Sequence, residues 1–176
     1  IVKQSYKNLE IIISDDSSSP PLKKIVDSFK NKLNKNSKLI YYFHKKNLGI
    51  YWNLMFVFGK ATGDFIVFMQ HDDWFIDNDF FSNSVKKFQN DENIKVVIGN
   101  SEFEKTKQKS LLIDNNFSKV IDGSTFVNRN LFRNMFPIFS AVIYRMDALI
   151  KTNYKDLFVD SITAEKMGVE IDECFR

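Results

Sequence analysis

The sequence predicts an α/β domain built on a Rossmann-like, mostly parallel sheet flanked by helices. Over the first 99 residues, short apolar runs rich in β-branched residues alternate with segments whose apolar positions recur at helical spacing. This alternation is typical of parallel strands joined by right-handed crossovers. Two of the apolar runs also end in paired aspartates. Such ends are where open parallel sheets bind ligands.

The elements of this first part follow from hydrophobic period and from turn residues. A Ser/Pro turn, with Ser19 as the predicted cap and Pro20 as the first helical residue, separates the first strand from the first helix. Asn47-Leu48-Gly49 is a turn, and Thr62-Gly63 closes the helix that follows it. Asp77 is the predicted cap of the third helix. The predicted elements are strands over residues 9–16, 38–44, 64–70 and 94–98, and helices over 22–33, 50–61 and 80–88.

The alternation breaks after Gly99. Residues 101–113 are polar and extended, as in a hairpin. The remaining predictions are helices over 123–132 and 146–151, a strand over 139–144 and a mostly helical segment over 156–176. No repeat or linker divides the chain, so residues 1–176 are predicted to form a single domain.

The composition excludes several classes of protein. With 176 residues, 44% of them hydrophobic and 27% charged, the chain is long and apolar enough to fold around a core. A net charge of +3 with scattered lysines gives no basis for nucleic-acid binding. The single cysteine, Cys174, excludes an intrachain disulfide. No apolar run reaches the roughly 18 to 20 residues that span a bilayer, and no signal peptide is visible.

The two acidic strand ends are the most informative local feature. The runs that end in Asp15-Asp16 and in Asp72-Asp73 place adjacent like charges beside an apolar strand. Because such charges repel, we expect a partner that neutralises them. Carboxylate oxygens suit Mg²⁺ or Mn²⁺ carrying a phosphate, and four carboxylates near one crevice would form such a site. The alternative is that the aspartates are exposed turn residues that cap the following helices.

Several segments together resemble a family 2 glycosyltransferase. Residues 5–18 are similar to its opening pattern Q-x-Y-x-N-x-E-I-I-I-V-D-D-G-S. Asn47-x-Gly49, Asn53 and residues 61–66 resemble its block N-x-G…N…A-x-G-D-Y-I. His71-Asp72-Asp73 falls where the family carries its D-x-D-D metal motif. The likeness extends from Ser5 to about Asp77 with the order and spacing kept.

The resemblance implies a GT-A fold and transfer of a sugar from a nucleotide-diphosphate donor. It assigns Asp15 and Asp16 to the base or ribose, with Asp16 the better candidate, and Asp72 and Asp73 to Mn²⁺ or Mg²⁺. The expected nucleotide-binding set is Asp15, Asp16, Asn47, Gly49, Gln70, His71 and Asp72. For Asn47 a plain turn role stays open, for His71 a neutral hydrogen-bonded side chain, and for Trp74 either ring stacking or packing of the loop.

The chain departs from the family pattern at three points. Gln70 stands where the family has the first aspartate of D-x-D, and a neutral amide binds metal more weakly than a carboxylate. Ser17 replaces the usual glycine after the first aspartate pair. The family's first strand and helix have no counterpart before Ile1, and Arg176 lies inside a predicted helix. We therefore expect a domain truncated at both ends.

The predicted catalytic base lies late in the chain. An inverting transfer needs a carboxylate that takes the proton of the attacking hydroxyl. In the family it belongs to an acidic pair at the start of a late helix, and Asp172 fits best here, with Glu173 next and Asp160 third. Surface acids on a C-terminal helix are the alternative.

The sequence thus predicts a metal-dependent inverting glycosyltransferase of bacterial cell-surface glycan synthesis. Its partners would be a nucleotide-diphosphate sugar and a saccharide or lipid-linked acceptor, with no nucleic acid. Residues 1–99 would bind the donor and residues 100–176 the acceptor. The expected location is cytoplasmic, with peripheral association at the inner face of the membrane left open. The alternatives are a non-catalytic nucleotide-sugar-binding module and a nucleotidyltransferase.

Overall fold

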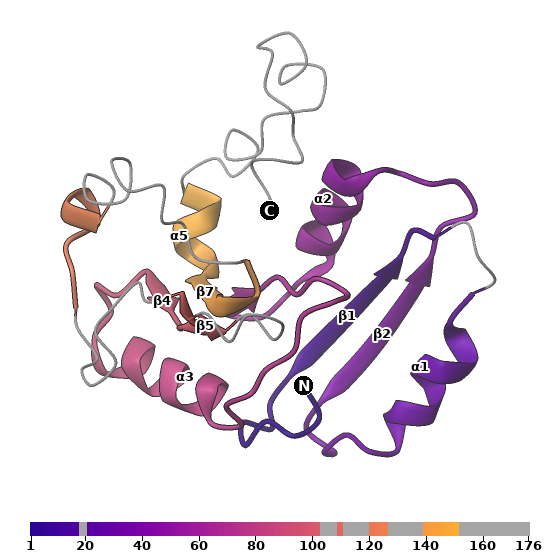
Figure 1. Cartoon of the computed structure of the whole chain (residues 1–176), viewed down its shortest axis with the longest axis horizontal. Coiled ribbons are helices and arrows are strands. Elements are labelled where there is room, and N and C mark those ends of the chain that lie inside the picture. The colour runs from indigo at the N-terminus through magenta and orange to yellow at the C-terminus, as the bar shows by residue number, and fades with distance from the viewer. Residues whose placement is uncertain (18–20, 103–108, 111–119, 127–138, 152–176) are drawn as a thin grey trace, which may run out of the picture.

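The computed structural model describes residues 1–17, 21–102, 109–110, 120–126 and 139–151. Within these residues the chain is α/β, with helices beside short strands (Figure 1). The strands form a parallel pair, a three-stranded antiparallel sheet and a two-residue antiparallel ladder. The α/β class is confirmed. The prediction of a mostly parallel sheet is wrong for the described residues, because only one strand pair is parallel.

The parallel pair consists of β1 (Glu10–Asp15) and β2 (Lys38–Phe43), connected through α1 (Lys23–Lys30). The two strands lie in register from Glu10 opposite Lys38 to Asp15 opposite Phe43. Both therefore end at the same edge of the sheet, where the first aspartate pair follows. Helix α1 lies beside this pair (Figure 1).

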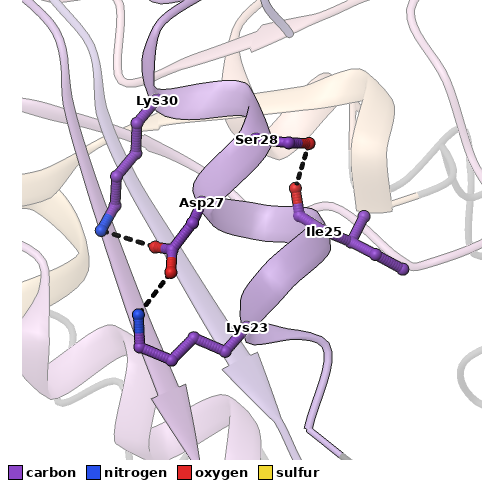
Figure 2. Close-up of polar contacts among 5 residues, drawn as sticks. All are labelled: Lys23, Ile25, Asp27, Ser28 and Lys30. Carbon is purple, nitrogen blue, oxygen red and sulfur yellow. Dashed lines mark hydrogen bonds and ion pairs between the residues drawn. The ribbon is translucent and has the colours of Figure 1, made fainter.

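Helix α1 begins later than predicted, since its cap position is Leu22 and the predicted first turn falls largely outside the described residues. Of its apolar side chains only Val26 is buried, whereas Ile25 is 60% exposed. On another side of the helix, Asp27 pairs with Lys23 one turn earlier and with Lys30 at 2.7 Å (Figure 2). These exposed ion pairs stabilise α1 only weakly.

Strand β3 (Phe65–Val67) follows α2 (Ile50–Lys60) and is shorter than predicted. It pairs only as far as Val67 opposite Ile143. The residues that precede β7, the partner strand, form a 3₁₀ helix, η1 (Phe139–Ala141), so β3 has no strand to pair with beyond this point. The segment from Phe68 to the aspartate pair therefore leaves the sheet as a loop.

The antiparallel sheet has the order β3-β7-β4, with β7 (Val142–Arg145) between β3 and β4 (Val96–Ile98). Val142 and Ile143 of this central strand are buried, at 2% and 4% exposed, as their apolar side chains favour. A late strand thus separates two early strands that run in the same direction, as required when both pair antiparallel with β7. This insertion is the reason that the parallel prediction fails there.

The core lies between this sheet and α3 (Phe80–Asn90). Phe81, Val85 and Phe88 are buried as predicted, and Phe80 is half-buried. The ring of Phe88 stacks on that of Phe65 in β3 at 4.5 Å. Stacked aromatic rings of this kind add stabilisation beyond their buried area.

The start of α3 is capped differently from the prediction. Asp77 bonds the amide of Asp79 and does not reach the helical amides. Instead, the side-chain oxygen of Gln4 accepts from Phe81 N at 3.2 Å, while its amide nitrogen donates to Asp77 O at 2.6 Å. Gln4 is only 2% exposed. Gln4, 77 positions before Phe81, thus accepts the hydrogen bond that a local cap residue would otherwise accept.

The remaining described elements agree with the predictions. Strands β5 (Ser101–Glu102) and β6 (Lys109–Ser110) pair antiparallel, as in the predicted hairpin. Residues 123–126 are helical, and α5 (Met146–Lys151) follows β7. Among the described helices, none has the length and apolar character needed to cross a membrane.

Candidate functional site

The first acidic strand end holds Asp15 in a closed hydrogen-bond set. One carboxylate oxygen accepts from the amide and hydroxyl of Ser17, at 3.1 and 2.7 Å. The other accepts from Tyr41 Oη at 2.6 Å and from Leu22 N at 3.2 Å. The residue is only 6% exposed. Its carboxylate therefore joins β1, β2 and the start of α1.

The environment of Asp15 keeps its carboxylate charged. Burial acts to raise the pKa, but the hydrogen bonds from Tyr41 and Ser17 and from the amides of Leu22 and Ser17 outweigh it and lower the pKa from 3.8 to about 2. Burial and the bond to Asp15 raise the pKa of Tyr41, which keeps its proton. The pair is stable as a charged acceptor and a neutral donor.

Asp16 holds the loop that begins α2. Its two carboxylate oxygens accept from Leu48 N at 2.7 Å and Gly49 N at 3.0 Å. Asn47 returns a bond from its side-chain amide to the backbone oxygen of Asp16 at 2.7 Å. Gly49 has φ = 79°, which glycine adopts without strain, and it is the cap residue of α2. An anion at this helix start is favourable because it faces the positive end of the helix dipole.

A polar network beneath this loop fixes α2 to the sheet. Ser14 Oγ donates to Asn53 Oδ1 of α2 at 2.5 Å and lies 2.8 Å from His44 Nε2. Because the hydroxyl proton goes to Asn53, the histidine must donate through Nε2. The His44 ring also meets that of Phe56 edge-on at 4.6 Å. Asn53 thus ties α2 to β1 through Ser14.

The second acidic strand end is more open. His71 and Asp72 have side chains that are 98% and 71% exposed, and His71 Nδ1 lies 4.0 Å from Asp72 Oδ1. Gln70 is exposed, and Trp74 is 60% exposed. Gln70, His71 and Asp72, predicted to meet a ligand at this strand end, are therefore exposed, whereas Asp15 is buried and Asp16 half-buried at the first.

Asp73 is held from a distant part of the chain. Its Oδ2 accepts from the hydroxyl of Ser140 in η1 at 2.5 Å. The same hydroxyl oxygen accepts from Gln70 N at 3.3 Å, and Asp73 N donates to Gln70 O at 3.5 Å. Ser140 is 5% exposed. The turn of residues 70–73 is thus tied to a buried side chain.

These residues offer a small set of metal donors. Mg²⁺ and Mn²⁺ take hard oxygen ligands, and Mg²⁺ is commonly held by one or two carboxylates together with substrate phosphates. Asp72 and Asp73 match that description. In the described part of the chain, no group of three or more histidine, cysteine or acidic side chains is close enough to hold a metal. The predicted cluster of four carboxylates is therefore not assembled among these residues.

The structure brings some predicted site residues together and leaves others apart. Hydrogen bonds join Asp16 to Asn47 and Gly49. The Asp72-Asp73 turn is tied to Ser140 instead. The three candidates for the base, Asp160, Asp172 and Glu173, lie outside the described residues.

Two residues that bind the aspartates, Tyr41 and Ser140, were not predicted from the sequence. Tyr41 lies opposite Ile13 in the parallel register, which puts its hydroxyl within reach of Asp15 two residues on. A prediction of the register between β1 and β2 would have identified Tyr41 as a partner of Asp15. Ser140 is 67 residues from Asp73 and carries no local signal.

A pocket of about 290 Å³ lies away from the aspartates. Its lining includes Gln4, Tyr6 and Leu9, which precede β1, and Leu33 and Ser37, which precede β2. Because β1 and β2 are parallel, this pocket belongs to the opposite edge of the sheet from Asp15 and Asp16. It is therefore not part of the candidate site.

Known proteins resemble this chain over most of its length. It is 29% identical over 170 residues to an uncharacterized glycosyltransferase of Haemophilus influenzae, covering 96% of this chain and 66% of that protein. It is 28% identical over 129 residues to an uncharacterized glycosyltransferase of Rickettsia felis, covering 72% of this chain and 19% of that protein. Glycosyltransferase GlyA of Streptococcus pneumoniae is 27% identical over 143 residues, with 77% and 18% covered.

The chain therefore spans about a fifth of the Rickettsia and Streptococcus relatives. The family model described as "Glycosyl transferase family 2" matches residues 1–152, which include both acidic strand ends, the loop at Asn47 and Gly49, and Ser140. The earlier resemblance is confirmed by this match, and the chain belongs to glycosyltransferase family 2.

Proposed function

We propose that this chain belongs to a metal-dependent, inverting glycosyltransferase. It would transfer a sugar from a nucleotide-diphosphate donor to a saccharide or lipid-linked acceptor in cell-surface glycan synthesis. The observation that carries this proposal is the turn after β3, which presents Asp72, 71% exposed, beside Asp73, whose carboxylate is oriented by a hydrogen bond. Family membership supplies the reaction class.

Asp72 and Asp73 would hold the metal ion, either Mn²⁺ or Mg²⁺. When bound, such an ion neutralises negative charge on the diphosphate as it leaves the sugar. Gln70 precedes this pair as an exposed neutral amide and adds a hydrogen-bonding group without adding charge. His71 is nearly fully exposed and is free to contact the donor.

Asp16 and its loop would receive the nucleoside. Asp16 is half-buried and already accepts from two amides, so its remaining lone pairs are the ones a ribose or base would meet. Asn47 and Gly49 are hydrogen-bonded to Asp16 and would line the same site. Asp15 would sit next to the nucleoside site, although its carboxylate already accepts four hydrogen bonds from Ser17, Leu22 and Tyr41.

The chemical step would need one base. The acceptor oxygen forms a bond to the anomeric carbon, the bond from that carbon to the diphosphate oxygen breaks, and the hydroxyl proton passes to a carboxylate. Asp172 remains the first candidate for this base, followed by Glu173 and Asp160. Residues 100–176 would contribute the acceptor side, and a cytoplasmic location at the inner membrane face would suit a lipid-linked acceptor.

The experiment that tests the proposal is incubation of the chain with a panel of labelled nucleotide-diphosphate sugars and Mn²⁺, followed by separation of products. Sugar transfer or donor hydrolysis that EDTA abolishes is the expected result. Binding without turnover would favour the alternative, a non-catalytic nucleotide-sugar-binding module. The neutral Gln70 supports that alternative, because an amide binds metal more weakly than a carboxylate. If no donor of the panel binds or reacts, the proposal is wrong.

A further inference from the structure

A buried serine donates a hydrogen bond to one carboxylate of the acidic turn. Ser140 Oγ lies 2.5 Å from Asp73 Oδ2, although the two residues are 67 positions apart. Ser140 is 5% exposed, whereas Asp72, next to Asp73, is 71% exposed in its side chain. The two carboxylates of one pair therefore differ sharply in how firmly they are held.

The proton of Ser140 has one destination. A serine hydroxyl has one hydrogen to donate and lone pairs to accept with. An ionised carboxylate only accepts, so the hydroxyl donates to Asp73 and its oxygen accepts from Gln70 N at 3.3 Å. Asp73 Oδ2 and Gln70 N thereby each have a hydrogen-bond partner, and Ser140 is the donor in the bond to Asp73.

The position of Ser140 is set by the core and not by the turn. It lies in η1, directly before β7, the central strand of the antiparallel sheet. The next residue, Ala141, accepts from Gly99 N at 2.7 Å, and the preceding Phe139 contacts the ring of Phe68 at 5.7 Å. Ser140 is therefore a fixed point to which the more exposed turn is attached.

We propose that Ser140 is a positioning residue for the metal site, acting through Asp73; this inference rests on the proposed function. The bond to Oδ2 orients the carboxylate, and Oδ1 is then the oxygen that would be offered to a metal. Asp73 would then be the prearranged ligand, and Asp72 would join it from a side chain that is 71% exposed. Partners that orient metal ligands in this way typically contribute about 10- to 100-fold to metal affinity.

Mn²⁺ affinity tests this inference directly. Mn²⁺ is titrated into the chain by electron paramagnetic resonance, alone and with UDP, GDP or CDP. We expect Ser140→Ala to weaken Mn²⁺ binding about 10-fold or more. Ser140→Thr keeps the hydroxyl and should restore most of the affinity. Ser140→Cys keeps the size but donates weakly, and it serves if the alanine variant fails to fold.

Ser84→Ala is the matched control. Ser84 is also buried, at 2% exposed, but its hydroxyl bonds Phe80 O within α3. This variant should bind Mn²⁺ as the parent does. A purely structural loss at Ser140 would lower the thermal midpoint of the metal-free chain and leave the Mn²⁺ affinity of the folded variant unchanged.

Asp73→Ala and the double variant separate positioning from other effects. If Ser140 acts through Asp73, Ser140→Ala has no further effect on Mn²⁺ affinity once Asp73 is alanine. Two results would overturn the role of Ser140 but not the proposed function. One is an equal loss of Mn²⁺ affinity from Ser140→Ala in the parent and in Asp73→Ala; the other is unchanged Mn²⁺ affinity in Ser140→Ala and Ser140→Cys. If the parent chain binds no Mn²⁺ under any of these conditions, the proposed metal dependence fails as well.

Discussion

Two acidic strand ends with the same local pattern have different fates in this chain. After β1, Asp15 and Asp16 accept six hydrogen bonds between them, all from protein groups. After β3, Asp73 accepts one bond from Ser140, and Asp72 is 71% exposed. In the first pair Asp15 is saturated by protein donors, while Asp16 keeps the lone pairs proposed for the nucleoside; the second pair is engaged by fewer protein donors. Adjacent aspartates at a strand end thus do not by themselves identify a binding site.

The comparison is broken most strongly at Asp15. Asp15→Ala removes the buried carboxylate that accepts hydrogen bonds from Tyr41, Leu22 and Ser17. We expect the free energy of unfolding to fall by about 2 to 4 kcal/mol, as measured by urea denaturation. Tyr41→Phe removes a single bond and should cost about 1 kcal/mol. Equal stability of Asp15→Ala and the parent would show that the set does not support the fold.

The opposite result is expected at Asp72. Asp72→Ala should weaken Mn²⁺-dependent binding of a nucleoside diphosphate by about 100-fold or more, since half of the carboxylate donor pair is lost. The unfolding free energy should change by less than about 0.5 kcal/mol, because the side chain is exposed. Calorimetry of binding and urea denaturation measure the two effects.

Asp64→Asn is the control for that change, because Asp64 is exposed and lies just before β3, whereas Asp72 follows it. This variant should bind as the parent does. Equal affinity in Asp72→Ala and the parent would place the metal site elsewhere.

The acid dependence of stability tests the role of Asp15. The pKa of Asp15 lies at about 2 in the folded chain, below its ordinary 3.8. Because the folded pKa is the lower one, its contribution to stability is complete above about pH 4 and is lost as the pH falls toward 2. Urea denaturation at a series of pH values should show this loss. In Asp15→Asn this component of the acid dependence should vanish; an unchanged acid limb would assign it to other groups.

The smallest expected effect sharpens the second strand end. Gln70→Asp adds the carboxylate that the family pattern carries at this position, on a residue that is exposed. We expect Mn²⁺ affinity to rise about 3- to 10-fold through the added ligand charge. The Mn²⁺ titration measures it, and Gln70→Asn serves as the neutral control. Weaker binding in Gln70→Asp would mean that the neutral amide itself serves the site.

Much of the first half of the fold was predictable from local signals. The apolar period and the turn residues placed β1, α1, β2, α2 and α3 within a few residues of where they lie. The inward faces of α3 followed from spacing alone. The start of α3 did not, because its cap comes from Gln4, far away in the chain. Local patterns predict elements well, since hydrogen bonding and burial repeat along the segment itself.

The sequence by itself determined the strand-helix alternation, the acidic ends of two strands and the likeness to family 2 glycosyltransferases. Only the tertiary structure decided that β7 inserts between β3 and β4, and that Tyr41 and Ser140 engage the aspartates. The physical reason is that identical Asp-Asp turns carry the same charge but meet different neighbours when the sheet assembles. Which carboxylate is saturated and which stays open depends on donors that only long-range packing brings within reach.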